Sequence, residues 1–176
     1  MIRIVFLNGV GGTGKNTLSE TVQQIVRPDD VLVSHISTVD TVKSICESIG
    51  IPKEPKTDEK RALWNEFKSA WIKFNNGPFN ETNERIDHLL LAYQQHIIFV
   101  DVREPAELRK FKNHYGDRCR TVLFKRDGIH IPDNPADRSV TRFDYDLILE
   151  NNGGLEDISI PAKRLVNYLM SVEVAE

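Results

Sequence analysis

The residues best suited to chemistry stand near the amino terminus, where glycines and a lysine follow a short apolar run. Gly9, Gly14 and Lys15 match the spacing G-x-x-x-x-G-K directly after the apolar residues 2–7. Glycines allow the backbone to form a ring of inward-pointing N–H groups, and a helix that begins near Lys15 adds the positive end of its dipole. The segment therefore predicts a main-chain cradle for a triphosphate, closed by an ammonium group, in preference to a plain glycine-rich turn.

The side chains that follow the lysine refine this prediction. Asn16 stands where many phosphate loops carry a hydroxyl group, and Thr17 comes one position later. This G-K-x-T ending resembles that of nucleoside monophosphate kinases similar to adenylate kinase. We expect the Thr17 hydroxyl to contact a phosphate or Mg²⁺, directly or through water, and the alternative is an ordinary helix residue. The residues expected to bind ATP are Gly9, Gly11, Gly12, Thr13, Gly14, Lys15, Asn16 and Thr17.

The pattern of apolar residues predicts the elements that must position this loop. Short runs rich in Val and Ile alternate with stretches in which apolar residues recur at helical spacing. Such alternation is typical of buried parallel strands joined by helices. The predicted fold class is α/β, a doubly wound parallel sheet of about five strands with helices on both faces, as in adenylate-kinase-like P-loop proteins. The runs expected to form strands are 2–7, 31–36, 97–100, 121–124 and 147–149.

Composition places the chain among globular proteins with one domain. It has 176 residues, 23 basic and 26 acidic side chains, and a formal net charge of −3. This balance predicts no stable nucleic-acid partner, and no run reaches the about 20 apolar residues that a membrane span needs. Cys46 and Cys119 are too few for a disulfide framework, which favours a cytoplasmic setting. We expect one domain, 1–176, with a helical excursion at about 38–95 and a lid at about 126–143.

Residues 37–43, after the second expected strand, read Ser-Thr-Val-Asp-Thr-Val-Lys. They resemble the S-T-G-D-x-x-R segment of adenylate kinases, and the matching segment of bacteriophage-type deoxynucleoside monophosphate kinases, where a lysine stands at the last position. The resemblance implies that Thr38, Asp40 and Lys43 contact the acceptor nucleotide, although Val39 replaces the glycine of the pattern. The alternative is that Thr38 is a helix cap and Lys43 a solvated charge.

Asp101 and Arg103 stand at the carboxyl end of the third expected strand, the edge at which open α/β sheets bind ligands. A carboxylate there can order water on Mg²⁺, and an arginine can bind a phosphate through two parallel hydrogen bonds. The string Asp101-Val-Arg103, with Pro105 and Glu107, resembles the D-V-R-x-P-x-E signature of the same bacteriophage-type kinases. The resemblance implies that Arg103 contacts the acceptor phosphate; the alternative is a surface ion pair with Asp101.

A polar stretch between the fourth and fifth expected strands carries Arg126, Arg138 and Arg142. Lids of related kinases use such arginines to neutralise the transferring phosphate, which would place Arg138 beside Lys15 in catalysis. Because aspartates are interspersed among them, a solvated loop with weak ion pairs is an equally good interpretation.

The stretch from 52 to 95 matches no motif. Its aromatic residues at helical spacing predict a helix face buried in the core, with stacking on an acceptor base as the alternative. They are Trp64, Phe67, Trp71 and Phe74. The histidines show no metal-ligand spacing, and we assign them no role.

The resemblance implies a kinase that transfers the γ-phosphoryl group of ATP, with Mg²⁺, to a nucleoside or deoxynucleoside monophosphate. Lys15, Arg103 and Arg138 would be catalytic, and Thr17 and Asp101 would contact the metal. Two alternatives remain from the motif alone. One is a kinase that phosphorylates a hydroxyl group of a small metabolite with Asp40 as base, and the other is an ATP-binding module without catalysis. The sequence predicts neither the acceptor base and sugar nor the oligomeric state.

Overall fold

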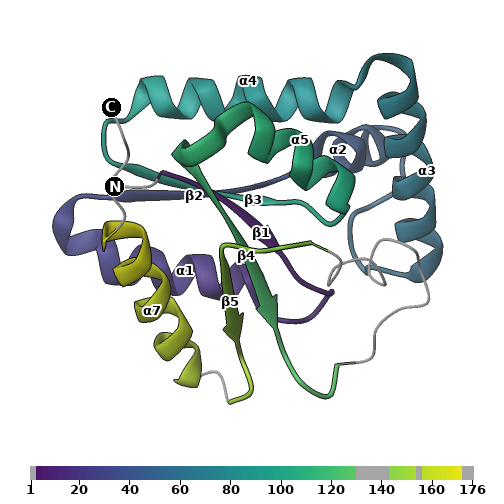
Figure 1. The fold of residues 1–176 in the computed structure, drawn as a ribbon. Coiled ribbons are helices and arrows are strands. Elements are labelled where there is room, and N and C mark those ends of the chain that lie inside the picture. Colours follow the sequence, from purple (N-terminus) through teal and green to yellow (C-terminus); the bar gives the residue numbers. More distant parts are fainter. Residues whose placement is uncertain (1–2, 130–142, 154–155, 172–176) are drawn as a thin grey trace. The chain divides into compact units, whose positions relative to one another are not determined.

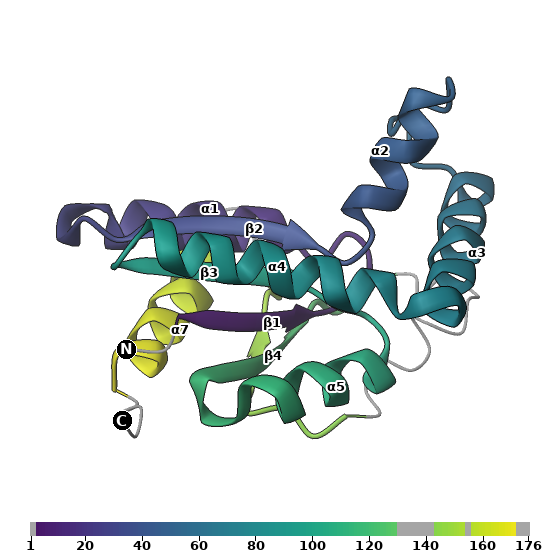
Figure 2. The same ribbon diagram turned by 90° about the horizontal axis from the view of Figure 1, so that it is seen from above.

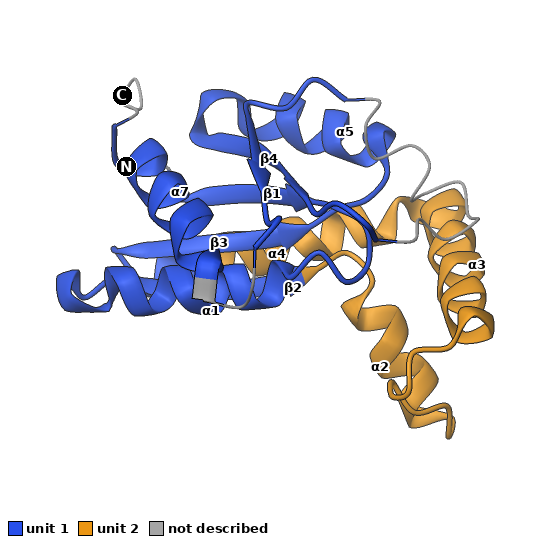
Figure 3. Ribbon diagram, turned by 90° about the horizontal axis from the view of Figure 1, so that it is seen from below, with its two compact units in different colours: residues 1–36, 89–176 blue, residues 37–88 orange. Residues whose placement is uncertain are grey.

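The computed structural model describes residues 3–129, 143–153 and 156–171. The chain divides into two compact units, coloured separately in Figure 3: Met1–Ile36 with Leu89–Glu176, and Ser37–His88. No helix of the described residues combines the length and the apolar character that crossing a membrane requires.

The first unit is built on a five-stranded parallel sheet with the strand order β2-β3-β1-β4-β5. Central strand β1 is paired on both sides, with Val5 opposite Phe99 of β3 and Arg120 of β4. The predicted fold class is thereby confirmed, and each expected strand is present. The strands are β1 (Ile4–Asn8), β2 (Leu32–Ser37), β3 (His96–Asp101), β4 (Cys119–Lys125) and β5 (Leu147–Glu150).

Helices cover both faces of this sheet, as Figures 1 and 2 show. Helices α1 (Lys15–Val26) and α7 (Ser159–Ser171) pack together on one face. Helix α5 (Pro105–Tyr115) covers the other, where Phe111 stacks on Phe6 of β1 at a ring distance of 4.7 Å. Pro105 suits the first turn of α5 because its fixed φ is helical and its missing N–H has no partner to lose there. Short 3₁₀ turns lie at Arg27–Asp29, Gly116–Arg118 and Glu156–Ile158.

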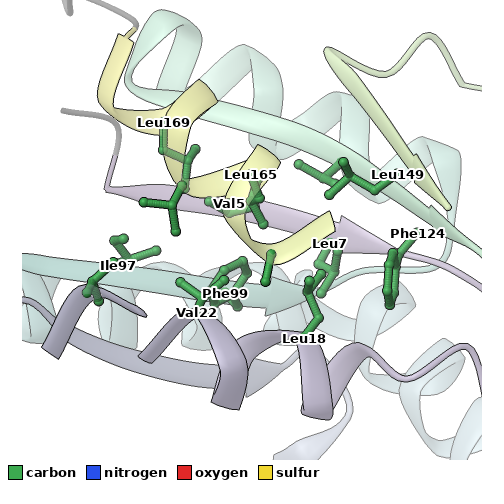
Figure 4. Close-up of a cluster of buried hydrophobic side chains, with 14 of the residues drawn as sticks. Val5, Leu7, Leu18, Val22, Ile97, Phe99, Phe124, Leu149, Leu165 and Leu169 are labelled. Carbon is green, nitrogen blue, oxygen red and sulfur yellow. The ribbon is translucent and has the colours of Figure 1, made fainter. Parts of the chain in front are cut away.

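The core of the first unit lies between the sheet and the α1–α7 layer. Leu18 and Val22 of α1 are fully buried against strand residues such as Val5, and Leu165 joins them from α7 (Figure 4). Each such side chain contributes about 1.5–3 kcal/mol through burial. The amphipathic pattern of α1 therefore fixes the start of this helix, and with it the loop that precedes it.

The second unit consists of helices α2 (Asp40–Ser48), α3 (Asp58–Asn75) and most of α4 (Gly77–Ala92). The hydroxyl of Thr57 accepts a hydrogen bond from the Lys60 amide and so caps α3. A small cluster of Val42, Cys46 and Trp64 joins α2 to α3.

The prediction that all four aromatic residues of α3 are buried in a core is wrong in part. Trp64 is buried, but Phe67 is 40% exposed and Phe74 is 84% exposed. Trp64 and Trp71 of α3 pack in or against the cluster with Val42 and Cys46, whereas Phe67 and Phe74 are not part of it.

Both cysteines are free thiols with buried side chains. Cys46 belongs to the cluster of the second unit, and Cys119 opens β4. Burial raises the pKa of the Cys119 thiol to about 11, and the nearby Lys112 ammonium group opposes this rise only in part.

Candidate active site

The glycine-rich segment forms a loop between β1 and α1. Gly9, Gly12 and Gly14 have φ values of 153°, 89° and 93°, which side chains disfavour. At Gly9 a Cβ would lie 2.3 Å from the carbonyl oxygen of Phe124 in β4, so only glycine allows the loop to pass this strand. The sequence prediction of a main-chain turn leading into a helix N-terminus agrees with this geometry, since α1 begins at Lys15.

Lys15 points back into the loop that it follows. Its ammonium group donates hydrogen bonds to the carbonyl oxygens of Gly9 and Val10, at 2.6 and 3.3 Å. The side chain is buried, with 9% of the residue exposed. A cation is thus held at the centre of the glycine loop, where a phosphate chain bound by the loop amides would meet it.

Asn151, just beyond β5, holds the far side of this loop. Its amide nitrogen donates to the carbonyl oxygen of Thr13 at 2.9 Å, and its own backbone N–H donates to Lys125 at 2.8 Å. The Thr13 hydroxyl in turn donates to Val10 at 3.0 Å. The turn preceding α1 is therefore fixed from two directions before any ligand binds.

Asn8, the last residue of β1, joins the loop to the neighbouring strand. It is fully buried; its side-chain oxygen Oδ1 accepts from the Gly9 amide at 2.7 Å, and its side-chain nitrogen donates to the backbone carbonyl oxygen of Arg103 at 3.0 Å. The same nitrogen donates to the Tyr145 hydroxyl at 2.7 Å. Burial raises the pKa of Tyr145 to about 12, and the hydrogen bond from Asn8 offsets this only in part.

The glycine loop follows the carboxyl end of β1, and Arg103 follows the carboxyl end of the neighbouring strand β3. These strands are neighbours, and the helices that follow them, α1 and α5, lie on opposite faces of the sheet (Figure 1). Such a switch in direction opens a crevice at the strand ends. Leu7 of β1 lies opposite Asp101 of β3, and Arg103 follows β3, so Asp101, Arg103 and the glycine loop stand at the same edge of the sheet.

Asp101 has a buried oxygen that fits a cation or its bound water. Its Oδ1 lies 3.1 Å from Nε2 of His35 but accepts no hydrogen bond from the described residues. Thr17, the other expected metal contact, lies half-buried in the first turn of α1. No group of three or more His, Cys, Asp or Glu side chains among the described residues could hold a metal. This sparse oxygen donor set fits Mg²⁺, which keeps most of its water and substrate phosphate ligands.

In the second unit, Asp40 contacts Lys43, another residue expected to bind the acceptor. Its carboxylate accepts a hydrogen bond from the Ser37 amide at 2.8 Å, and it lies 3.5 Å from the Lys43 ammonium group. Arg85 of α4, which sequence reasoning did not single out, lies 3.7 Å from the same carboxylate. Thr38 is buried at the start of this segment. Two cations therefore share one acidic residue.

The predicted lid is described only at its ends. Arg126 is exposed just after β4, and the next residue, Asp127, exchanges hydrogen bonds of 2.9 Å with Asn152. Arg138 and Arg142 lie outside the described residues.

Four residues with contacts at the site were not identified from the sequence: Asn8, His35, Arg85 and Asn151. Each acts through a partner far along the chain, and amide side chains at strand ends match no catalytic motif. A polar residue at the end of a buried strand is the one local signal they offered, and it applies to Asn8 and Asn151.

No family model matches this sequence, and no curated protein matches it. Among solved structures, an APS kinase mutant from Mycobacterium tuberculosis is similar at 17% identity and a TM-score of 0.49, covering 96% of this chain and 97% of its own. A gluconokinase from Sinorhizobium meliloti 1021 is 16% identical with a TM-score of 0.46, covering 97% of each chain. A shikimate kinase from Bacteroides thetaiotaomicron is 17% identical with a TM-score of 0.46, covering 96% of this chain and 98% of its own.

Proposed function

We propose that this protein transfers the γ-phosphoryl group of ATP to a nucleoside or deoxynucleoside monophosphate. The observation that carries the proposal is the Lys15 ammonium group inside a ring of glycines at the head of α1, a geometry suited to a triphosphate tail. The acceptor class rests on the resemblance of residues 37–43 and 101–107 to kinases of monophosphates.

The chemistry of a phosphate acceptor suits the charges of this site. The acceptor oxygen is already ionised near neutral pH, so transfer needs alignment and positive charge more than a base. Lys15 and Arg103 supply that charge at the sheet edge, with Arg138 proposed from the lid. Asp101 and Thr17 would hold Mg²⁺, which when bound neutralises charge on the phosphates.

Besides Arg103, we propose Lys43 and Arg85 as contacts of the acceptor phosphate. Both stand beside Asp40, whose carboxylate orients them while leaving other donors of the guanidinium group unused by that contact. Asp40 itself accepts the Ser37 amide and faces two cations, which suits an anchor for positive groups better than a base that must take up a proton.

A coupled assay of ADP formation tests the proposal. The acceptors are a panel of ribo- and deoxynucleoside monophosphates, with sugars and polyols for comparison. We expect turnover with at least one monophosphate and none with the alcohols.

Asp40→Asn distinguishes a kinase of nucleoside monophosphates from a kinase that phosphorylates a hydroxyl group. With a monophosphate acceptor, this substitution should raise KM and leave most of kcat, since no proton must be removed. A near-complete loss of kcat with an alcohol acceptor would establish the hydroxyl kinase in its place. ATP binding without turnover on any acceptor would establish a binding module.

A further inference from the structure

His35 joins two parts of the site that lie on different elements. Its Nδ1 lies 2.9 Å from the Ser19 hydroxyl of α1, and its Nε2 lies 3.1 Å from Oδ1 of Asp101 in β3. The Ser19 hydroxyl also lies 2.8 Å from the carbonyl oxygen of Asn16. A continuous chain of polar contacts thus runs from the first turn of α1 through β2 to the acidic residue at the end of β3.

The proton of Ser19 sets the direction of this chain. A hydroxyl group has a single proton, and the Asn16 carbonyl oxygen and Nδ1 of His35 both lie within its reach. When Nδ1 accepts that proton, the one N–H of a neutral imidazole lies on Nε2, which faces Asp101. The bond between Ser19 and Nδ1 fixes the plane of the imidazole ring, which also lies against Phe99 at a ring distance of 6.3 Å. The ring is therefore held on two sides before it meets Asp101.

The buried Oδ1 of Asp101 accepts no well-aligned hydrogen bond from the described residues, and its polar contact is the 3.1 Å approach of His35 Nε2. A side chain at a strand end can adopt several rotamers, and a contact with a fixed group offsets the conformational entropy lost when one rotamer is selected. His35 is that group, and it is anchored to the helix that also carries Lys15 and Thr17.

We propose that His35 is a positioning residue, which holds the Asp101 carboxylate in register with the first turn of α1. This inference rests on the proposed function, because Asp101 and Thr17 are the residues proposed to hold Mg²⁺. Groups that orient metal-binding carboxylates commonly change metal affinity by about tenfold or more when removed. The glycine loop and Lys15 do not depend on His35 for their own contacts, so binding of metal-free ATP should not depend on it.

Calorimetry with ATP, in EDTA and then in Mg²⁺, tests this role without reference to turnover. We expect His35→Ala to weaken binding of ATP with Mg²⁺ by about tenfold and to change binding of ATP in EDTA less than twofold. Ser19→Ala should act in the same direction, since it frees the other side of the ring. His35→Gln, which keeps a donor near the carboxylate, should restore most of the affinity.

His88→Ala is the matched control, because His88 is an exposed histidine of α4. Thermal unfolding checks that each variant is folded. Equal losses with and without Mg²⁺ would show a merely structural role and overturn the proposal, as would no loss in either condition. Both outcomes leave the proposed kinase function standing provided that the unaltered protein binds ATP more tightly with Mg²⁺. Failure of the unaltered protein to bind ATP would overturn the function itself.

Discussion

The ammonium group of Lys15 donates a 2.6 Å hydrogen bond to the carbonyl oxygen of Gly9, the first glycine of its own loop. The lysine therefore spans the loop from the helix end to the strand end. A phosphate bound by the loop amides would draw this cation from neutral carbonyls to a charged partner, which makes a stronger hydrogen bond.

Lys15→Ala should lower turnover by more than about 100-fold while the protein stays folded. The reason is that one cation at the transferring phosphate contributes about 3 kcal/mol or more to the transition state. Steady-state ADP release and circular dichroism measure the two effects. Lys163→Ala, on an exposed position of α7, should leave turnover unchanged. An unaltered rate in Lys15→Ala would refute the role assigned to the loop.

Gly9→Ala should destabilise the protein, whereas Gly11→Ala should not. A Cβ at Gly9 would lie 2.3 Å from the Phe124 carbonyl oxygen, with φ at 153°, while a Cβ at Gly11 would have nothing within 4 Å. Backbone strain of this kind costs of order 1–3 kcal/mol. Urea unfolding in the absence of nucleotide gives both free energies. Equal stability of the two variants would contradict the close approach of the loop to β4.

Asn151→Asp should lower the free energy of unfolding by about 1–3 kcal/mol, because a carboxylate oxygen would replace the amide that donates to Thr13. The same change should weaken ATP binding, since the turn before α1 loses its fixed partner. Denaturation and calorimetry measure the two losses. Asn113→Asp, an exposed substitution on α5, should alter stability by less than about 0.5 kcal/mol. Similar losses in both variants would argue against the contact.

Stability should fall as the pH drops below about 6.5, the ordinary pKa of histidine, and His96 is one cause. Burial lowers the pKa of His96; its hydrogen bond with the Leu89 carbonyl opposes this, and the Arg3 cation adds to it. Below that pH the unfolded chain binds a proton that the folded protein does not, so the free energy of unfolding decreases.

Unfolding free energies from pH 8 to pH 5 measure this effect. His96→Asn should be less stable throughout, because the 2.9 Å contact with Ser34 is altered, yet it should lose less stability on acidification. The exposed His88→Asn should follow the unaltered protein. An identical pH slope in His96→Asn would exclude His96 as the cause.

The centre of the sheet was predictable because strands β1, β3 and β4 are almost wholly buried and contain continuous apolar runs. The exact ends of the strands were not predictable. Strand β1 extends to the polar residue Asn8. Strand β4 begins at Cys119, two positions before the apolar run at 121, because Cys119 and Arg120 pair with Ile4 and Val5. A local pattern carries no information about a partner strand. The predicted burial of Phe74 was wrong for a related reason, since helical spacing shows which residues share a face of the helix but not what packs against that face.

The glycine loop was predictable from spacing alone, but the side chains that brace it were not. Asn151 lies 138 positions from Thr13, and Asn8 lies 95 positions from Arg103. Only the folded sheet, with β1 between β3 and β4, brings these ends together. Arg85 likewise meets Asp40 only through the packing of the helices in the second unit.

The burial of Cys46 and Cys119 has a practical consequence for following nucleotide binding in solution. Maleimide dyes react with exposed thiolates, and neither native thiol offers one: both are buried, and burial holds the Cys119 thiol protonated far above neutral pH. A single cysteine introduced on the surface would therefore accept a fluorophore selectively, with both native cysteines left in place.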